Sequence, residues 1–331
     1  KFIIYFILLI PSLLILDTIN RETISFYMSG PISLTLCGFF FSSFYINNTQ
    51  LKNCLFSLFL PLAGMLLSLV YSTYTSEILF TAAGSMGRVV TGGIGPNQMS
   101  SALGLGALIS FLLSCMIGKN QIIKLSLYFF MILFLIQSIL SFSRGGFWGG
   151  VLAILVALFY LVQDRRLRIT LVFSGVIIYL IGVLGVFPFI SNFTEGFLST
   201  RYSSYDTTGR IERMGWDMEN FLRHPIFGIG PGGSEGIFRM ELQRIGYTSH
   251  TEFSRLFSEH GLLGIIAFLI LVNLTTNRIF RHNRPVAKAI VVSCTFWALF
   301  YMGHQAMRLV APSFMFGFAA INFYYNTDNN T

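Results

Sequence analysis

Residues 125–162 read "LSLYFFMILFLIQSILSFSRGGFWGGVLAILVALFYLV", and this stretch decides the fold class. Two apolar runs, 125–142 and 147–162, are separated only by the motif SRGG at 143–146. Each run approaches the roughly 20 apolar residues that a helix needs to cross a bilayer. The pattern predicts two transmembrane helices joined by a very short turn.

Apolar runs of this kind recur along the whole chain. Of its 331 residues, 54% are hydrophobic and only 11% are charged, with a mean hydropathy of +0.68. A soluble domain would have a charged fraction of about 25%, so this class is excluded. We predict an all-α, polytopic integral membrane protein with about ten transmembrane helices, at 2–16, 24–45, 54–71, 99–117, 125–142, 147–162, 169–189, 261–276, 286–303 and 309–325.

The segment 190–260 is the only extended polar region. We expect an N-terminal transmembrane bundle at 1–189, a larger loop with short amphipathic helices at 190–260, and C-terminal transmembrane helices at 261–331. Cytoplasmic loops normally hold the excess of lysine and arginine. Alternate breaks between the spans contain all the lysines, which places these breaks inside and the long loop outside. The expected location is a bacterial inner membrane, with the loop in the periplasm.

On the outer side every cation is an arginine. A guanidinium group can bind a phosphate or carboxylate through two parallel hydrogen bonds, whereas lysine acts more as a point charge. For most of these arginines, contact with lipid phosphates or surface ion pairs is the simpler interpretation. Arg144 differs, because the break that contains it is too short to leave the membrane boundary. A cation at that depth is costly unless it is paired or lines a wet cavity, so Arg144 is a functional candidate.

Apolar residues from Gly209 to Arg223 recur at helical spacing and predict an amphipathic helix. It should end at His224, since proline disfavours helical geometry in the residue before it. Arg210 lies in the first turn, where free backbone N–H groups also attract anions, and we favour an anion contact for it. For Arg213, a surface ion pair with Asp217 is the simpler interpretation.

Two other motifs of the loop were considered as ligand sites. Asp217 and Glu219 have the spacing of an acidic metal motif, but residues two apart on a helix point to different faces. We therefore predict no metal site. The glycines of "FGIGPGG", 227–233, follow no strand of the dinucleotide-binding type, so a tight turn at the membrane surface is expected in place of a phosphate-binding loop.

The stretch "TSHTEFSRLFSEHGLLG", 248–264, contains a candidate base. Ser249 lies three residues before Glu252, as in a capping box, which makes Ser249 the N-cap and His250 the first helical residue. The positive end of the helix dipole disfavours a charged imidazole there and leaves a neutral general base. A simple interface role for His250 is an equal alternative. His304, in a short outer break with Arg308, could line the same cavity.

Taken together, these motifs resemble the O-antigen ligase and polymerase family of bacterial envelope proteins. The resemblance covers roughly residues 88 to 264, and two features depart from it: Thr251 stands where ligases commonly show Asn, Ser or Gln, and about ten spans are expected where ligases usually have about twelve. The matching pieces are SRGG at 143–146, GR at 209–210 followed by Trp216 and by HPIFGIGPGG at 224–233, His250-Thr251 before GLLG at 261–264, and GIGPNQMSSALGL at 94–106 with Arg88 upstream.

The resemblance implies a metal-independent and cofactor-free glycosyltransferase at the outer face of the inner membrane. Its donor would be a glycan on undecaprenyl diphosphate, and its acceptor a lipid A core sugar in a ligase or another lipid-linked glycan in a polymerase. Arg144 and Arg210 would hold the diphosphate, while His250 would take the proton of the acceptor hydroxyl. Partners would be these glycans and membrane lipids, with no nucleic acid; the remaining candidates for substrate binding are Arg88, Arg213, Arg308 and His304.

Polymerase is the preferred assignment, because of Thr251 and the small size of the chain, with ligase as the alternative. A lipid-glycan flippase or anion transporter would also use arginines in a cavity. Transporters are often built from repeated halves, and the sequence shows no such repeat. A structural subunit would tolerate single substitutions of the candidate residues.

Overall fold

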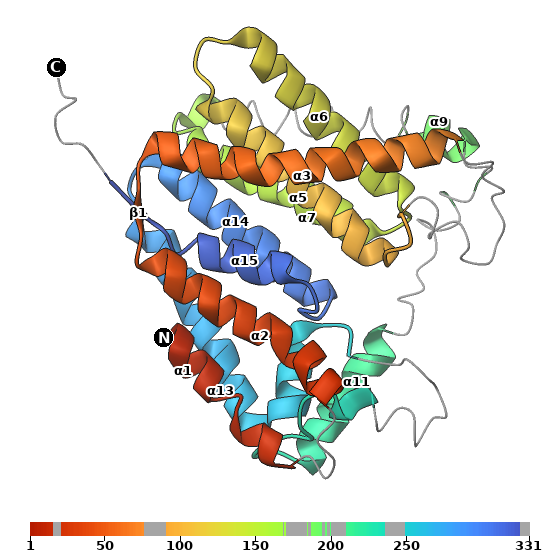
Figure 1. Ribbon diagram of the computed structural model, residues 1–331, viewed down its shortest axis with the longest axis vertical. Helices are drawn as coiled ribbons and strands as arrows, with labels where there is room; N and C mark the ends of the chain where they lie inside the picture. The colour runs from red at the N-terminus through yellow and green to blue at the C-terminus, as the bar shows by residue number, and fades with distance from the viewer. Residues whose placement is uncertain are drawn as a thin grey trace. The chain divides into compact units, whose positions relative to one another are not determined.

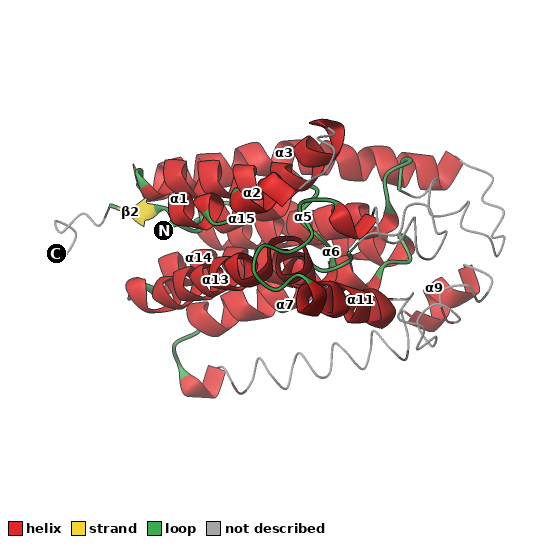
Figure 2. Ribbon diagram, turned by 90° about the horizontal axis from the view of Figure 1, so that it is seen from below, coloured by secondary structure: helices red, strands yellow, loops and turns green. Residues whose placement is uncertain are grey.

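The computed structural model describes residues 1–15, 21–75, 91–167, 210–235 and 249–324, the short segment 187–193 and the single residues 169, 184, 196 and 199. It is an all-α membrane protein, in which helices account for nearly all regular structure of the described residues (Figure 2). The chain forms two compact units. The first comprises 1–46, 206–283 and 294–331, and the second comprises 47–205 and 284–293.

The second unit is built around α5 (Pro96–Met116), which contacts α3 (Asn48–Thr75), α6 (Gln121–Leu140) and α7 (Arg144–Leu161), as Figure 1 shows. It also includes α9 (Phe187–Phe193) and the beginning of α14 (Pro285–His304). Most side chains of α5 are buried, whereas α3 and α6 expose apolar side chains on their outer faces. This distribution is typical of a central helix surrounded by lipid-facing ones.

Small residues bring α5 and α7 into close contact. A Cβ atom added to Gly146 would lie 2.0 Å from the backbone carbon of Ser100, and one added to Gly104 would lie 2.2 Å from the carbonyl oxygen of Gly146. Such approach between membrane helices depends on residues that lack a side chain. The two helices are joined by a very short turn, as expected, but it lies at 141–143: α6 ends at Leu140 and α7 begins at Arg144, so RGG at 144–146 forms the first turn of α7.

The first unit contains the other helices and a pair of short strands. Helix α2 packs against α1 and α15, and the two-residue strands β1 and β2 pair in parallel. The bounds are α1 (Phe2–Ile7), the 3-10 helix η1 (Pro11–Ile15), α2 (Arg21–Ser42), β1 (Tyr45–Ile46), α11 (Arg210–Arg223), α13 (Glu252–Arg281), α15 (Val310–Phe318) and β2 (Asn322–Phe323).

The long helix α13 is kinked at Gly261, whose φ of 59° and ψ of −139° are non-helical. The backbone groups around the kink are satisfied by the turn that follows α11. Ile229 and Gly230 donate their N–H groups to the carbonyls of residues 258 and 259 at 3.0 Å each, and the N–H of residue 262 donates to the Pro225 carbonyl at 2.7 Å. The glycine-rich stretch is thus a tight turn, as expected, but it packs on the backbone of α13.

Helix α11 confirms the amphipathic helix expected for this region, and it ends at Arg223 as the following proline dictates. Asp217 and Asn220 are buried toward the protein. The opposite face exposes a continuous stripe of large apolar side chains, which is typical of a helix that lies on a membrane surface. The members of this stripe are Ile211, Met214, Met218 and Leu222.

Seven helices of the described residues are long and apolar enough to cross a membrane, which leaves the expected count of ten unconfirmed. Two expected spans differ in form. The segment 2–16 forms α1 and η1 with a break between them, because Pro11 opens the second element. The described part of 309–325 contains the nine-residue α15 and the short strand β2. The span expected at 169–189 lies almost wholly outside the described residues. The boundaries expected at 189 and 260 stay a prediction.

Candidate functional site

His250 lies two residues before α13 and not in its first turn. The N-cap of α13 is Thr251, whose hydroxyl accepts a hydrogen bond from the Ser254 N–H at 3.1 Å. The expected capping box with Ser249 as N-cap is therefore wrong. The hydroxyl of Ser249 donates instead to Asp217, and the Glu252 carboxylate accepts from the Met307 N–H, so tertiary partners occupy both ends of the box.

The imidazole of His250 faces α11, where Nη1 of Arg213 contacts its Nε2 atom. A guanidinium group has donors only, so Nε2 must supply the lone pair and the proton of the neutral ring must be on Nδ1. Arg213 was expected to form a surface ion pair with Asp217. The structure corrects this, because Asp217 is buried and bonded by serine hydroxyls, while Arg213 turns toward the histidine.

Burial and the surrounding arginines keep His250 uncharged. Burial is the main cause that lowers the pKa of its imidazole from 6.5 to about 4, followed by the positive charges of Arg213, Arg210 and Arg308 and by His304. Above about pH 4 the ring is therefore neutral. The sequence predicted a neutral imidazole through the helix dipole, but desolvation and neighbouring guanidinium groups produce it.

Arg308 approaches the same loop from the other side. Its Nη2 donates to the carbonyl of Ser249 at 3.0 Å, directly before His250. The guanidinium carbon lies 5.5 Å from the ring centroid of Tyr27 and 5.8 Å from that of Phe26, within the range of cation–π contacts. Arg308 thus fixes the backbone beside the imidazole and adds positive charge there.

The other expected site residues are placed as follows. His304, the last residue of α14, is half-buried, and its Nδ1 donates to the Phe300 carbonyl at 2.8 Å. Arg210 is the half-buried first residue of α11.

The first unit thus contains five of the seven candidates. Four of them contribute to the low pKa of the fifth, His250; these four are Arg210, Arg213, Arg308 and His304. Arg144 is the half-buried first residue of α7 in the second unit, and Arg88 lies outside the described residues.

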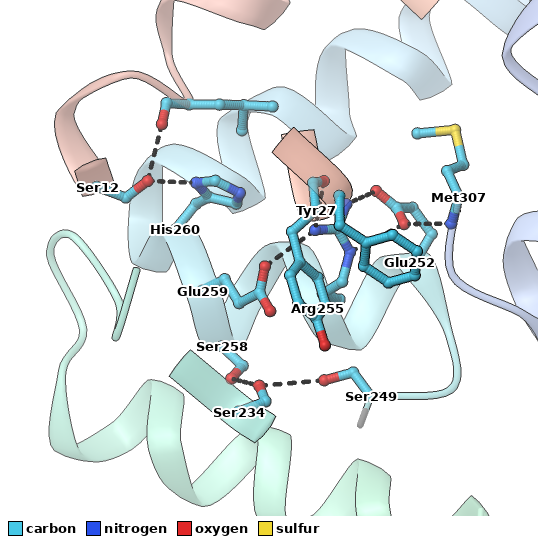
Figure 3. Close-up of polar contacts among 12 residues, drawn as sticks. Ser12, Tyr27, Ser234, Ser249, Glu252, Arg255, Ser258, Glu259, His260 and Met307 are labelled. Carbon is cyan, nitrogen blue, oxygen red and sulfur yellow. Dashed lines mark hydrogen bonds and ion pairs between the residues drawn. The ribbon is translucent and has the colours of Figure 1, made fainter. Parts of the chain in front are cut away.

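A cluster of hydroxyls around Asp217 went unnoticed in the sequence. The carboxylate accepts hydrogen bonds from Ser249 at 2.7 Å, Ser254 at 2.6 Å and Ser234 at 3.5 Å. Burial raises the pKa of Asp217, and these three hydroxyls act against that increase. Figure 3 shows how Ser258, Ser234 and Ser249 continue the cluster. Single serines scattered over 25 residues give no sequence signal, because only the fold gathers them.

A buried ionic network in α13 went unnoticed as well (Figure 3). Arg255 is fully buried between Glu252 and Glu259, with Nε to Glu252 at 3.0 Å and Nη1 to Glu259 at 2.9 Å. Glu252 also accepts from the backbone N–H of Met307 at 2.8 Å. The spacing of three and four residues is the signal that sequence reasoning could have used, since it places all three charges on one helix face.

Acidic metal ligation by Asp217 and Glu219 is not supported by their positions. Asp217 is buried, whereas Glu219 is exposed and forms a 2.6 Å ion pair with Arg223. Within the described part of the chain, no group of three or more His, Cys, Asp or Glu side chains could hold a metal ion.

Comparison with known proteins gives one family match. No curated protein matches the chain. Residues 127–269 match the family model described as O-antigen ligase, a segment that contains Arg144, Arg210, Arg213 and His250. The resemblance drawn from the motifs is thereby confirmed over this part of the chain, which is similar to the O-antigen ligase family.

Proposed function

We propose that this protein is a membrane glycosyltransferase that transfers a saccharide from undecaprenyl diphosphate to a sugar hydroxyl at the periplasmic face of the inner membrane, as an O-antigen polymerase. The observation that carries the proposal is the uncharged His250 imidazole, whose electrostatic surroundings are set by three guanidinium groups. The family match over residues 127–269 supports it.

The arrangement suits a transfer from a diphosphate leaving group. The acceptor oxygen attacks the anomeric carbon of the donor sugar, and the bond between this carbon and the diphosphate oxygen breaks with its electron pair on that oxygen. The acceptor proton passes to His250, which becomes an imidazolium and later releases the proton to solvent. Fixed guanidinium groups stabilise the charge that grows on the diphosphate, which is the usual role of preorganised donors in catalysis.

The contact between Arg213 and His250 adds a condition to this mechanism. Since Arg213 occupies the lone pair of Nε2, this nitrogen cannot take a proton until the guanidinium moves away. A bound diphosphate offers Arg213 a charged bidentate partner, which is a better acceptor than a neutral nitrogen. We propose that donor binding draws Arg213 off the imidazole, so that the base becomes free only when the donor is in place.

The roles proposed for the remaining arginines rest on different observations. Arg210 and Arg308 contribute positive charge at His250 and are assigned to the diphosphate. Arg144 is assigned to it on the sequence resemblance, and its replacement by lysine should cause a large loss of activity, because the bidentate fit is lost. Wild-type activity in that variant would indicate lipid anchoring instead.

Substitution of His250 tests the base directly. We expect His250→Gln to reduce glycan transfer by purified protein in proteoliposomes by about 100-fold or more, the loss typical for a missing general base. His224→Gln is the matched control, because this histidine is exposed at the end of α11. Transfer by His250→Gln at the wild-type rate would disprove the base assignment.

Ligase is a second candidate, because the matching family is described as O-antigen ligase. Thr251 no longer argues against it: this residue is the N-cap of α13, a position at which Asn, Ser and Thr are all preferred. Gel analysis of lipopolysaccharide from a deletion strain separates the two. A core with a single repeat indicates a polymerase, whereas loss of all long chains from lipid A with accumulated lipid-linked polymer indicates a ligase.

A further inference from the structure

A single buried carboxylate joins the helix with Arg210 and Arg213 to the loop with His250. The side chain of Asp217 has no exposed surface. One of its oxygens, Oδ1, accepts from Ser249 at 2.7 Å, and Oδ2 accepts from Ser254 at 2.6 Å. A buried carboxylate is costly unless it is well hydrogen-bonded. Helix α11, the His250 loop and the first turn of α13 must therefore stay together to keep these contacts.

The spacing along α11 places Asp217 on the same side of the helix as two of the candidate arginines. Asp217 lies four residues after Arg213 and seven after Arg210, so all three project from one side of the helix. On the other side of the contact, Ser249 is the residue directly before His250. Through its hydrogen bond with Ser249, Asp217 therefore links the helix of the two arginines to the loop of His250.

We propose that Asp217 is a positioning residue, which holds the His250 loop against α11 and thereby sets the distance between the imidazole and the guanidinium groups of the site. The use of this geometry for catalysis rests on the proposed function. The positioning itself does not, and it can be measured without any glycan.

The directions of the hydrogen bonds show why a carboxylate is needed. Thr251 donates to Ser254 at 2.8 Å, and Ser254 donates in turn to Asp217, as Ser249 does. Asparagine would keep the size of the side chain but replace one accepting oxygen by an amide with two donors. To bond the amide, one serine hydroxyl would have to turn from donor to acceptor and give up its charge-assisted bond, which weakens the attachment of the loop to the helix.

The test is the Asp217→Asn variant, with the pKa of the His250 imidazole measured by NMR of labelled histidine in nanodiscs. The His250 signal is assigned by its loss in His250→Gln. Burial and the nearby arginines hold this pKa at about 4, so release of the loop should raise it toward 6.5. We also expect transfer to fall about tenfold or more, because a misplaced base loses most of its effect.

Glu219→Gln is the matched control on the same helix. Glu219 is exposed and forms an ion pair with Arg223, so its neutralisation should leave the His250 pKa unchanged. A purely structural role for Asp217 would lower the thermal unfolding temperature without a change in this pKa. The pKa therefore separates positioning from general stability.

Two serine variants keep the proposal testable if Asp217→Asn does not fold. Ser254→Ala and Ser249→Ala each remove one short bond to Asp217, and we expect both to raise the His250 pKa. Ser234→Ala removes only the 3.5 Å contact and should change it least. A wild-type pKa in folded Asp217→Asn, or in both short-bond serine variants, would overturn the proposal. Retained transfer by His250→Gln would instead overturn the proposed function, and leave the positioning intact.

Discussion

At the scale of single residues, the pKa of the His250 imidazole can be used to test whether donor binding precedes proton transfer. In the free protein, its low pKa results mainly from burial and then from nearby arginines. A bound diphosphate adds negative charge beside the same arginines, which must raise the pKa of the imidazole. The protonated ring cannot accept a proton, so activity is lost as the pH falls through the pKa of the relevant state.

The two limbs of the pH profile should therefore differ. We expect the acid limb of kcat/KM, which reports the free enzyme, near the pKa of about 4, and the acid limb of kcat, which reports the complex, at a higher pH. Initial rates of transfer between pH 3.5 and 8 at low and saturating donor measure both. Coincident limbs would contradict the proposed link between donor charge and His250.

Arg213 offers a second prediction at this scale. Arg213→Met removes a positive charge beside His250, so the pKa of the imidazole should rise. Loss of the anion contact should also raise KM for the donor about tenfold, the usual effect of one lost charged hydrogen bond. In wild-type protein, inorganic pyrophosphate should raise the same pKa by drawing Arg213 away, and in Arg213→Met it should do so much less. An equal response of both proteins would argue against the displacement of Arg213.

At the scale of secondary-structure elements, the kink of α13 and the turn after α11 depend on each other. The turn bonds three backbone groups beside the kink, the carbonyls of residues 258 and 259 and the N–H of residue 262. Both sides use glycine: a Cβ atom on Gly228 would lie 2.4 Å from the Glu259 backbone, and one on Gly261 would lie 2.6 Å from the Pro225 carbonyl. Side chains at either position would separate the turn from the helix.

Two glycine substitutions should consequently have opposite effects. Gly261→Ala forces a side chain into a backbone conformation that favours glycine, and should cost roughly 1–3 kcal/mol before the contact with Pro225 is counted. Gly215→Ala lies in α11 with no atom within 4 Å of its added Cβ, and should gain roughly 0.5–1 kcal/mol. Thermal unfolding in detergent measures both. A destabilised Gly215→Ala protein would show that α11 packs more closely than described.

Element boundaries also show where sequence reasoning succeeds and fails. The short junction before α7 was predictable to within three residues and the end of α11 to within one, because local signals dominate there: a break between apolar runs and a proline. The start of α13 was not. The local capping box of Ser249 lost to long-range bonds with Asp217, and no pattern in one sequence reveals such a competition.

At the scale of the whole molecule, hydropathy correctly predicted a polytopic helical protein but not how its shortest segments are built. Lys1 bonds Asn273 at 2.6 Å and Ser12 contacts His260 at 2.6 Å, so α1 and η1 run antiparallel to α13. From His260 to Asn273, α13 rises about 20 Å. The segment α1–η1 therefore lies along much of a span, although each of its two parts is too short to be a spanning helix itself. A hydropathy window reports apolar length and cannot distinguish these two forms.

The positive-inside rule gives a topology that labelling can test. In a background without the native cysteines, Glu219→Cys on α11 should react with a membrane-impermeant maleimide once the outer membrane is permeabilised. Lys119→Cys, exposed between α5 and α6, should react only after the inner membrane is broken. The reverse pattern would invert the topology and place His250 in the cytoplasm.

The apolar stripe of α11 has a consequence for cells under oxidative attack. Two of its exposed members, Met214 and Met218, are thioethers, which peroxide or hypochlorous acid converts to polar sulfoxides. With polar sulfoxides in its apolar stripe, α11 would bind the membrane surface less tightly, while the membrane-spanning helices would be unaffected. The proposed glycan transfer would then weaken under this stress and recover where sulfoxide reductases can act.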